Sequence, residues 1–411
     1  MSRVSHAVAA RPRALVVGGS IGGLFAARAL RRAGWDTTIF ERTGGLEGRG
    51  TGIVTHDKLL TALRWVGVEP DATLGVPVTM RQAFDADGRV IGERIHAQTV
   101  TSWERLFSIL RAGVADADYR TAHDLCDVEL LENGVRARFT NGVTEQGDLL
   151  VAADGFRSTV RSLLMPAVEP VYAGYVGWRG LTDEAELVAR LGSGFFDRFG
   201  FYLACSHQMV GYPVAGMGND LRPGRRRYNF VWYRPVDDDR LRELLTDASG
   251  QVHALSIPPP LIRAESLAEM RSTAEHELCP QFREVIRLTA QPFFQPIYDV
   301  CSERLVQGRV ALIGDAAFVA RPHVGAGVTK AAEDVLALAQ ALDGAAEIGS
   351  GLVDYEQARL ESGRQIVAWG RRLGGYLAPG HAMTMTPGET FDEPTPDAFM
   401  KDSASLEFLV A

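Results

Sequence analysis

Three short segments, far apart in the chain, contain residue types that could bind one long ligand with phosphate groups. They are residues 17–23 (VGGSIGG), 151–155 (VAADG) and 312–317 (LIGDAA). Each lies at the end of an apolar, strand-like run and places glycine or aspartate where the strand stops. Glycine turns let backbone N–H groups approach a phosphate, and carboxylates accept hydrogen bonds from sugar hydroxyls. Together the segments predict a site for a dinucleotide-like cofactor.

The first segment joins a short, buried, strand-like run to a helical pattern. This order of strand, turn and helix predicts the first half of a dinucleotide-binding unit. Gly18 allows the tight turn, and Gly23 allows the helix to pack closely on the strand. Ser20 takes the place of the middle glycine of the usual G-x-G-x-x-G pattern and can donate to a phosphate. We therefore predict that Gly18, Ser20, Ile21 and Gly23, at the helix N-terminus, bind the cofactor.

An acidic residue follows at the distance that such a unit needs. A second strand-like run, residues 36–40, ends at Glu41, which follows Gly18 by 23 residues. A carboxylate about 20 residues after the turn accepts the ribose hydroxyls of the cofactor. An acid there favours an unphosphorylated adenosine ribose, as in FAD or NAD. Glu41 and the adjacent Arg42 are therefore predicted cofactor ligands.

The other two segments favour a flavin over a nicotinamide. Asp315 follows a buried strand and is placed to accept hydroxyls from a ribityl chain. Gly325, Ala326 and Gly327 precede a long helical pattern, so their amides could face an anionic ring edge. A reduced flavin carries negative charge at such an edge, whereas nicotinamide does not. Asp154 could brace the same site, although it could also simply cap the end of its strand.

The composition is ordinary for a soluble globular protein and argues against several kinds of partner. Of the 411 residues, 46% are hydrophobic and 23% are charged, and the net charge is −8. Because no basic stripe is present, we expect neither nucleic acid nor an anionic membrane as a partner. The four cysteines form no C-x-x-C pair and the nine histidines are scattered, so we predict reduced thiols and no metal. No apolar run reaches the ~18 residues that span a bilayer, and we expect a cytoplasmic protein.

The chain predicts an α/β fold in which a sheet interrupts the cofactor-binding domain. Helix-like and strand-like runs alternate up to about residue 170, and aromatic strand-like runs with turn signals then follow. The predicted parts are a discontinuous Rossmann-like domain at 12–80, 98–172 and 285–345, an inserted and mostly antiparallel sheet domain at 81–97 and 173–284, a C-terminal helical segment at 346–378, and a tail at 379–411. The tail is rich in Pro, Gly, Asp and Thr, which indicates a mobile segment or a surface arm.

With its three cofactor segments in this order, the chain resembles the single-component FAD-dependent aromatic hydroxylases of the p-hydroxybenzoate hydroxylase fold. The resemblance covers about residues 12–375. It is closest to the branch that contains 2,6-dihydroxypyridine 3-hydroxylase, through residues 50–54 (GTGIV), 172–180 (YAGYVGWRG), 229–233 (NFVWY), 314–317 (GDAA) and 321–323 (RPH). It implies that FAD is the cofactor and that NADH or NADPH binds transiently to reduce it.

The resemblance also implies a reaction and three catalytic candidates. Oxygen adds at flavin C4a, and the resulting hydroperoxide hydroxylates an electron-rich aromatic or N-heteroaromatic ring while the protein excludes water. Pro322 matches a proline whose carbonyl faces the substrate and the flavin, and His323 follows it. His56 comes just after a stretch that in the family runs beside the isoalloxazine ring. A histidine could deprotonate a ring hydroxyl or ring N–H near neutral pH, although either histidine could instead be structural.

Four further residues are candidates for ligand contacts. Strand-like runs place Tyr202, Tyr212 and Trp232 where they could line a substrate pocket, although aromatic strands also build cores. Arg105 could contact the FAD phosphate, or it could be a solvated surface arginine.

Other classes fit the sequence less well. A flavin halogenase would need W-x-W-x-I-P, a disulfide reductase a redox cysteine pair, and a Baeyer–Villiger oxygenase a second G-x-G-x-x-G, and the sequence contains none of them. Two alternatives stay open: a biosynthetic monooxygenase acting on an indole or another large, pathway-specific ring, and a flavin-binding sensor without activity. The sequence also leaves open the identity of the ring, the choice of NADH or NADPH, and the formation of a homodimer.

Overall fold

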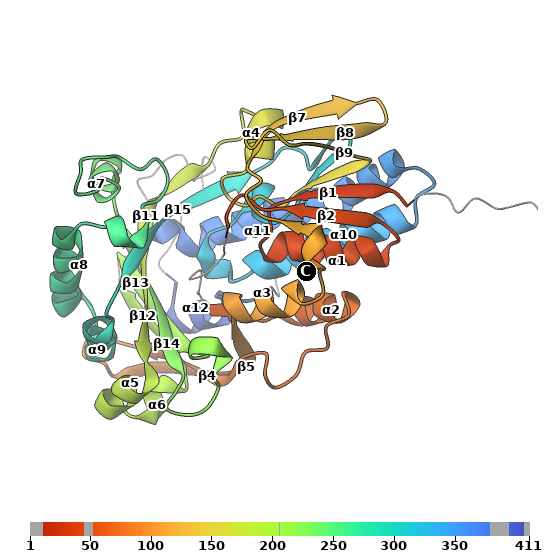
Figure 1. Ribbon diagram of the computed structural model, residues 1–411. Coiled ribbons are helices and arrows are strands. Elements are labelled where there is room, and N and C mark those ends of the chain that lie inside the picture. Colours follow the sequence, from red (N-terminus) through yellow and green to blue (C-terminus); the bar gives the residue numbers. More distant parts are fainter. Residues whose placement is uncertain (1–10, 45–51, 205, 379–393, 407–411) are drawn as a thin grey trace, which may run out of the picture.

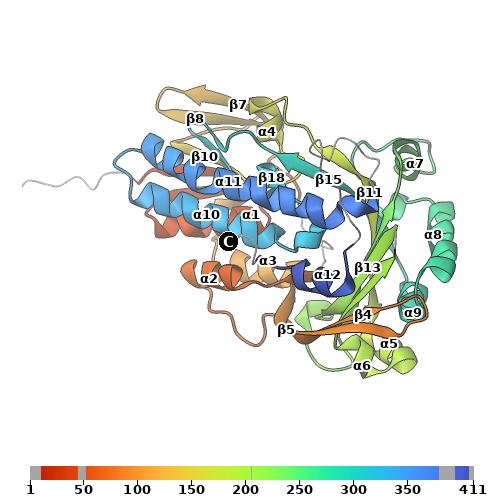
Figure 2. The ribbon, with the colours of Figure 1, turned by 180° about the vertical axis from the view of Figure 1, so that it is seen from behind.

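The computed structural model describes residues 11–44, 52–204, 206–378 and 394–406. Two large β-sheets occupy the two halves of the molecule, one containing β1 and β2 and the other containing β11 to β14 (Figures 1 and 2). Long helices lie against the first sheet, and shorter helices cover the outer face of the second. The candidate site forms where the two halves meet.

The first half is built on a mainly parallel sheet of six strands. Its order is β16 (Val306–Gln307), β17 (Val310–Leu312), β10 (Leu149–Ala152), β1 (Arg13–Val17), β2 (Asp36–Phe40) and β6 (Tyr119–Arg120). All of these pairs are parallel except β16–β17. Apolar and β-branched residues fill the central strands, as expected for a sheet that is covered on both faces. The predicted Rossmann-like domain is confirmed.

Helices pack on one face of this sheet and a small sheet lies on the other side (Figure 1). Helices α1 (Ile21–Arg32) and α11 (Ile348–Gly374) contact its strands, and α10 (Gly327–Asp343) packs against both of them. Helices α2 (Asp57–Trp65) and α3 (Trp103–Arg111) pack on α10 and α1. The other side carries β7 (Leu125–Leu131), β8 (Gly134–Phe139), β9 (Thr144–Gly147) and α4 (Thr159–Leu164). Helix α1 begins directly after the glycine turn and packs against α10, which brings the first and third cofactor segments together.

The second half is a sheet of nine strands. Its order is β18 (Phe318–Val319), β15 (Phe293–Cys301), β11 (Val171–Asp183), β14 (Arg227–Pro235), β13 (His207–Val214), β12 (Phe199–Ala204), β4 (Val76–Phe84), β5 (Val90–Ser102) and β3 (Gly52–Val54). Only β12–β4 pair in parallel. This confirms the predicted, mostly antiparallel sheet.

One face of the nine-stranded sheet packs on short helices and the other faces the first half of the molecule. The helices are α5 (Glu184–Leu191), α6 (Ser193–Phe196), α7 (Asp238–Leu244), α8 (Ala264–Glu277) and α9 (Pro280–Leu288). Because side chains alternate along a strand, each strand gives every second residue to this aromatic core and the others to the inner face.

Strand pairing differs from the predicted partition in two places. Strands β4 and β5 extend on both sides of the predicted 81–97 insertion. Strand β15 pairs with β11 in the nine-stranded sheet, whereas the sequence analysis assigns residues 285–345 to the cofactor domain. The chain therefore returns to the second sheet once more before the third cofactor segment.

The prediction of a mobile or surface tail is wrong for residues 394–406. This segment contains α12 (Pro396–Asp402), which contacts β4 and β5. Phe399 is 1% exposed and Met400 is fully buried. Burial of these two apolar side chains is favourable. The segment therefore packs onto the sheet, although many of the residues around them are turn formers. Residues 379–393 lie outside the described part of the chain.

Two further observations concern the described residues only. None of their helices is long and apolar enough to cross a membrane. Within the same residues, no group of three or more His, Cys, Asp or Glu side chains is arranged to hold a metal ion.

Candidate functional site

An elongated cleft opens where strands β1, β2 and β10 end. This outer cleft has a volume of about 530 Å³ and is lined by parts of all three cofactor segments. Among its lining residues are Gly18, Ser20, Glu41, Arg42, Asp154 and Asp315. Six of the predicted cofactor ligands therefore line one cleft.

The glycine turn leaves no room for a side chain at Gly18 or Gly23. Gly18 has a φ of +106°, and a Cβ there would lie 2.3 Å from the carbonyl oxygen of Ala153. A Cβ at Gly23 would lie 1.8 Å from the carbonyl oxygen of Gly18. Gly23 and Ile21 do not line the cleft; they fix how closely α1 approaches β1. The turn thus forms a cradle of backbone atoms at the N-terminus of α1, a kind of site that suits a pyrophosphate.

Glu41 stands at the end of β2 and anchors the turn. One carboxylate oxygen accepts from the Gly19 N–H at 2.7 Å, and the other accepts from the hydroxyl of Thr43 at 2.7 Å. Glu41 is only 5% exposed but still faces the cleft. A carboxylate has about four acceptor positions, so Glu41 keeps acceptor capacity for ribose hydroxyls. Arg42 is exposed beside it.

The predicted phosphate ligands Ser20 and Arg105 differ in position. Ser20 lines the outer cleft, and its hydroxyl accepts from the indole N–H of Trp103 at 3.3 Å. Arg105 donates to the hydroxyl of Thr73 at 2.5 Å and lines neither of the cavities described for this site. Arg105 lies on α3, and its contact with the FAD phosphate stays a prediction.

Asp154 has a structural task in addition to its place in the cleft. Its carboxylate accepts from the Ser158 hydroxyl at 2.6 Å and from the Val160 N–H at 3.1 Å, so it caps α4. Burial raises the pKa of Asp154, and these hydrogen bonds oppose the shift. Its contacts therefore cap the helix that follows, and not the end of its own strand.

Sequence reasoning missed Arg161, which ties two cofactor segments together. Its guanidinium donates to the carbonyl oxygens of Phe156 at 2.7 Å and Ala316 at 2.9 Å. Arg161 is 1% exposed, and burial lowers its pKa. The sequence shows only that an arginine follows shortly after the middle segment, and this does not indicate its role.

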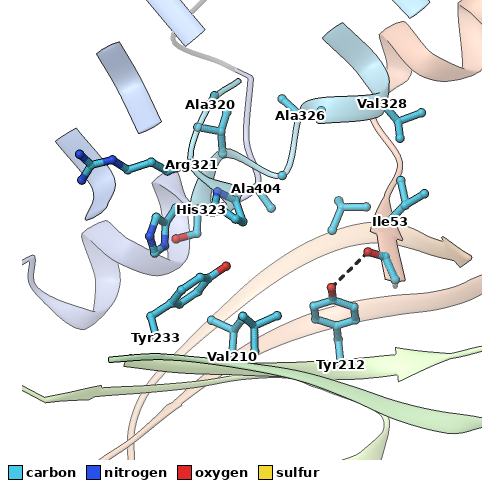
Figure 3. A pocket seen from close by; sticks show the side chains of 18 of the residues that line it. Ile53, Val210, Tyr212, Tyr233, Ala320, Arg321, His323, Ala326, Val328 and Ala404 are labelled. Carbon is cyan, nitrogen blue, oxygen red and sulfur yellow. Dashed lines mark hydrogen bonds between the residues drawn. The ribbon is translucent and has the colours of Figure 1, made fainter. Parts of the chain in front are cut away.

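A second cavity lies next to the outer cleft, and Asp315 lines both. This inner cavity has a volume of about 320 Å³ and lies between the nine-stranded sheet and the segment from Asp315 to Lys330 (Figure 3). Lys330, another residue that the sequence did not indicate, lies 3.3 Å from the Asp315 carboxylate and also donates to the Phe318 carbonyl. The two cavities together could hold one long ligand that bends at Asp315.

The N-terminus of α10 points into the inner cavity. Gly325 has a φ of +62°, and Gly325, Ala326 and Gly327 all line the cavity. The first N–H groups of a helix lack intrahelical partners and carry a partial positive charge. Pro322 lines the cavity just before them. This end of the cavity therefore suits the anionic edge of a ring.

The inner face of the sheet forms the opposite side of the cavity. Tyr212 and Tyr233 rise from it, and Figure 3 shows both rings directed at the cavity. The other two predicted aromatic residues face the opposite way: the Tyr202 hydroxyl donates to the Glu277 carbonyl, and the Trp232 indole N–H donates to His207. The assignment of Tyr202 and Trp232 to the substrate pocket is therefore corrected, and Tyr233 is the aromatic residue that was missed.

His323 lines the cavity and belongs to a buried hydrogen-bond chain. Its Nε2 lies 2.9 Å from the Tyr175 hydroxyl, and its Nδ1 lies 2.9 Å from the amide nitrogen of Gln208. The Tyr376 hydroxyl donates to the other end of that amide at 2.6 Å. Burial, reinforced by Arg321, lowers the pKa of His323 to about 3. The imidazole is therefore neutral at physiological pH, and both ring nitrogens already have partners.

His56 does not line either cavity. Its ring bridges the Thr329 hydroxyl at 3.0 Å and the Ala404 carbonyl at 3.3 Å. Burial lowers its pKa to about 4. His56 thus holds the start of α10 against the C-terminal segment, and the structure places it as a positioning residue instead of a group that reaches the ring.

The two histidines predict how stability depends on pH. Because their folded pKa values lie below the ordinary value near 6.5, the unfolded chain binds more protons between about pH 6.5 and 4. Stability should therefore fall as the pH falls through this window, by up to about 1.4 kcal/mol per pH unit for each histidine. Denaturation midpoints from pH 7.5 to 5 should show a smaller loss for His323→Gln than for the unaltered protein. An equal loss in both would contradict the buried, neutral state of His323.

Comparisons with known proteins agree with this geometry. A family model described as an FAD binding domain-like region matches residues 172–299, and one described as an NAD(P)-binding Rossmann-like domain matches residues 16–65. The chain is 33% identical to 2,6-dihydroxypyridine 3-monooxygenase of Paenarthrobacter nicotinovorans, over 93% of this chain and 97% of that protein. It is 32% identical to aurachin C monooxygenase/isomerase of Stigmatella aurantiaca, over 88% of each chain.

A solved structure gives the same result. The structure of 2,6-dihydroxypyridine-3-hydroxylase from Arthrobacter nicotinovorans superposes with a TM-score of 0.84 at 32% identity, covering 94% of this chain and 99% of that one. The resemblance of the sequence to this family, its FAD cofactor and its monooxygenase activity are thereby confirmed. The chain belongs to the FAD-dependent aromatic hydroxylases and is a flavoprotein monooxygenase.

Proposed function

We propose that FAD lies along the two cavities and that the inner cavity also receives the ring to be hydroxylated. The single observation that carries this proposal is that Asp315 lines both cavities, so that one extended cofactor could pass from one to the other. Gly18 and Ser20 would hold the pyrophosphate, Glu41 the adenosine ribose, and Asp315 the ribityl chain. The N-terminus of α10 at Gly327 would face the flavin ring.

The bound flavin supplies the redox chemistry and the activation of oxygen, and the chain supplies binding and shielding. The ring of Tyr233 packs against that of His323 with centroids 4.3 Å apart, which closes one end of the inner cavity. Phe399 and Ala404 of the C-terminal segment line another part of it. These residues would exclude water from the reacting atoms and orient the substrate ring.

The proposal also concerns which ring the protein hydroxylates. An electron-rich aromatic or N-heteroaromatic ring fits the volume and the aromatic lining of the inner cavity. The two relatives have nearly equal identities to this chain, and their names refer to a dihydroxypyridine and to aurachin C. A small catabolic ring and a larger biosynthetic ring therefore both remain candidates, with NADH or NADPH as the transient reductant.

The test is substrate-stimulated oxidation of NADH and NADPH by the purified, FAD-loaded protein. The panel should contain hydroxypyridines, phenols and indoles, with oxygen consumption and product mass as readouts. Stimulation by at least one ring, with a hydroxylated product, is the expected result. An FAD-loaded protein that no ring stimulates would support the flavin-binding sensor instead.

The role given to Asp315 predicts a loss of FAD affinity. Asp315→Ala should raise the Kd for FAD roughly 10- to 100-fold, because hydrogen bonds to a charged group contribute about 1.5–3 kcal/mol each. Asp343→Ala, an exposed position at the end of α10, is the control and should leave the affinity unchanged. Titration of the apoprotein with FAD, followed by flavin fluorescence, measures both. Equal affinities for the two variants would remove Asp315 from the proposed site.

A further inference from the structure

The inner cavity contains a buried arginine without a counter-ion. Three cationic side chains line this cavity: Arg179, Arg321 and Lys330. Arg321 pairs with Asp299 at 3.1 Å, and Lys330 pairs with Asp315 at 3.3 Å. None of the described residues forms an ion pair or hydrogen bond with Arg179, and its Nε is buried without a partner. Among the three cations that line the cavity, Arg179 is therefore the one for which the described residues supply no opposite charge.

The position of Arg179 on the sheet explains why the protein does not compensate it. Arg179 lies on β11 and is 8% exposed. Strand register aligns it with Val231, Val231 with Val210, and Val210 with Phe201. Residues aligned in this way share one face of a sheet, and all four line the inner cavity. Arg179 thus carries a charge in an otherwise apolar row. A partner for its guanidinium would have to bind in the cavity.

Two phenol groups flank this row, and one of them can support the same ligand. Tyr212 and Tyr233 stand on the neighbouring rows and are directed at the cavity (Figure 3). Burial raises the pKa of both, and the charge of Arg179 opposes the shift in each case. Both phenols are therefore protonated at neutral pH. The Tyr212 hydroxyl already donates to the Gly52 carbonyl at 3.3 Å, whereas none of the described residues accepts from the Tyr233 hydroxyl, which is available as a donor. A cation and a free phenol donor on one side of a cavity make a site for a negatively charged oxygen.

A buried charge without a partner is costly, and a ligand of opposite charge removes that cost. We propose that Arg179 receives an anionic oxygen of the aromatic substrate, either a carboxylate on the ring or an ionised ring hydroxyl. The planar guanidinium offers paired donors that match a carboxylate and also binds a single oxyanion. The inference rests on the proposed function, because it specifies which rings the same cavity accepts.

Ligand binding to the FAD-loaded protein tests this without requiring turnover. The probes are the three monohydroxybenzoates and indole-2-carboxylate, each compared with its own amide, and 2,6-dihydroxypyridine compared with 2,6-dimethoxypyridine. Perturbation of the flavin absorption spectrum gives each Kd. At least one anionic probe should bind more tightly than its neutral match, and Arg179→Gln should weaken that probe roughly 10- to 100-fold while sparing the match. The preferred pair distinguishes a carboxylate from an ionised hydroxyl.

Two variants make this comparison specific. Arg179→Lys keeps the charge and should keep part of the preference for the anionic probe. Arg234→Gln is the matched control, because Arg234 lies on the opposite face of β14 and pairs with Glu277 at 3.2 Å. It should bind every probe as the unaltered protein does. The proposal is overturned if the unaltered protein prefers no anionic probe, or if Arg179→Gln weakens both members of a pair equally or lowers FAD affinity instead.

Thermal denaturation gives a second test that needs no knowledge of the substrate. Arg179→Met removes an uncompensated buried charge, so the ligand-free variant should melt at a higher temperature than the unaltered protein. Arg321→Met removes one ion-pair partner of Asp299, so this variant should melt at a lower temperature. If Arg179→Met lowers the melting temperature as Arg321→Met does, the arginine has a protein partner and the inference fails. Failure here leaves FAD loading and ring-stimulated NAD(P)H oxidation, which test the proposed function, untouched.

Discussion

Replacement of Gly23 by alanine is expected to reduce FAD loading strongly. The added Cβ would lie 1.8 Å from the Gly18 carbonyl oxygen and 3.4 Å from a Val16 side-chain carbon. The Gly18 carbonyl belongs to the backbone of a tight turn. It can make room for the added Cβ only if the N-terminus of α1 moves away from β1. Such overpacking costs about 1–3 kcal/mol of stability. Loss of one or two backbone hydrogen bonds to phosphate, each about 1.5–3 kcal/mol, should weaken FAD binding roughly 100-fold or more.

The adjacent glycine supplies the control for this experiment. A Cβ at Gly22 would meet only the Ala331 side chain at 3.8 Å, an ordinary contact. Gly22→Ala should therefore bind FAD normally and melt no lower than the unaltered protein. The measurements are the FAD-to-protein ratio after reconstitution and the melting temperature. Full FAD loading of Gly23→Ala would contradict the close approach of α1 to β1.

Loss of the Arg81 side chain should uncouple NAD(P)H oxidation from hydroxylation. Arg81 is fully buried and donates to the carbonyl oxygens of Met400 and Ser403, at 2.5 and 2.7 Å. Hydrogen bonds from a charged donor contribute about 1.5–3 kcal/mol each. Without them α12 should detach, and the inner cavity, which Phe399 and Ser403 line, should open to water. Arg81→Met should then form several-fold less hydroxylated product per NAD(P)H and release hydrogen peroxide instead.

Arg94 provides the matched control for Arg81. The two residues face each other across β4 and β5, and Arg94 also contacts the C-terminal segment, through an exposed ion pair with Asp397 at 3.4 Å. Exposed ion pairs contribute about 0–1 kcal/mol, so Arg94→Met should keep its coupling. Equal coupling in both variants would show that the C-terminal segment does not shield the reaction.

The cofactor segments could be predicted from sequence because their signals are local. A strand, a glycine turn and a helix follow one another within about 25 residues, and Gly18 and Gly23 are required by contacts inside that unit. The position of Glu41 follows from the length of the same unit. Asp315 could be recognised because it also stands at the end of a buried strand. Arg161 could not, because it joins segments that only the folded sheet brings together.

The sequence does not show which face of the nine-stranded sheet lines the substrate cavity. Adjacent residues of a strand point to opposite faces, and the aromatic pair Trp232 and Tyr233 offers one residue to each. Both faces of this sheet are buried, so no pattern of polar and apolar residues shows which one faces the cavity. The same reason hides Arg179, which follows Trp178 on β11. Its lack of a counter-ion is a property of the folded chain alone.

The C-terminal segment illustrates a different limit. Its content of proline, glycine and threonine favours a mobile arm, and nothing local to Phe399 or Met400 identifies what buries them. The buried Arg81, more than 300 residues earlier in the chain, supplies the hydrogen bonds that hold this segment in place. Contacts of this range follow from the fold and not from the pattern around either partner.

The most direct test of the central claim is the origin of the oxygen atom in the product. The FAD-loaded protein should be given NADH or NADPH, the stimulating ring and ¹⁸O₂, and the product should be examined by mass spectrometry. We expect one ¹⁸O atom in each hydroxylated ring, with incorporation strongly reduced in the Gly23→Ala variant and retained in Gly22→Ala. A product whose new oxygen comes from water, or a protein that takes up no FAD, would contradict the account.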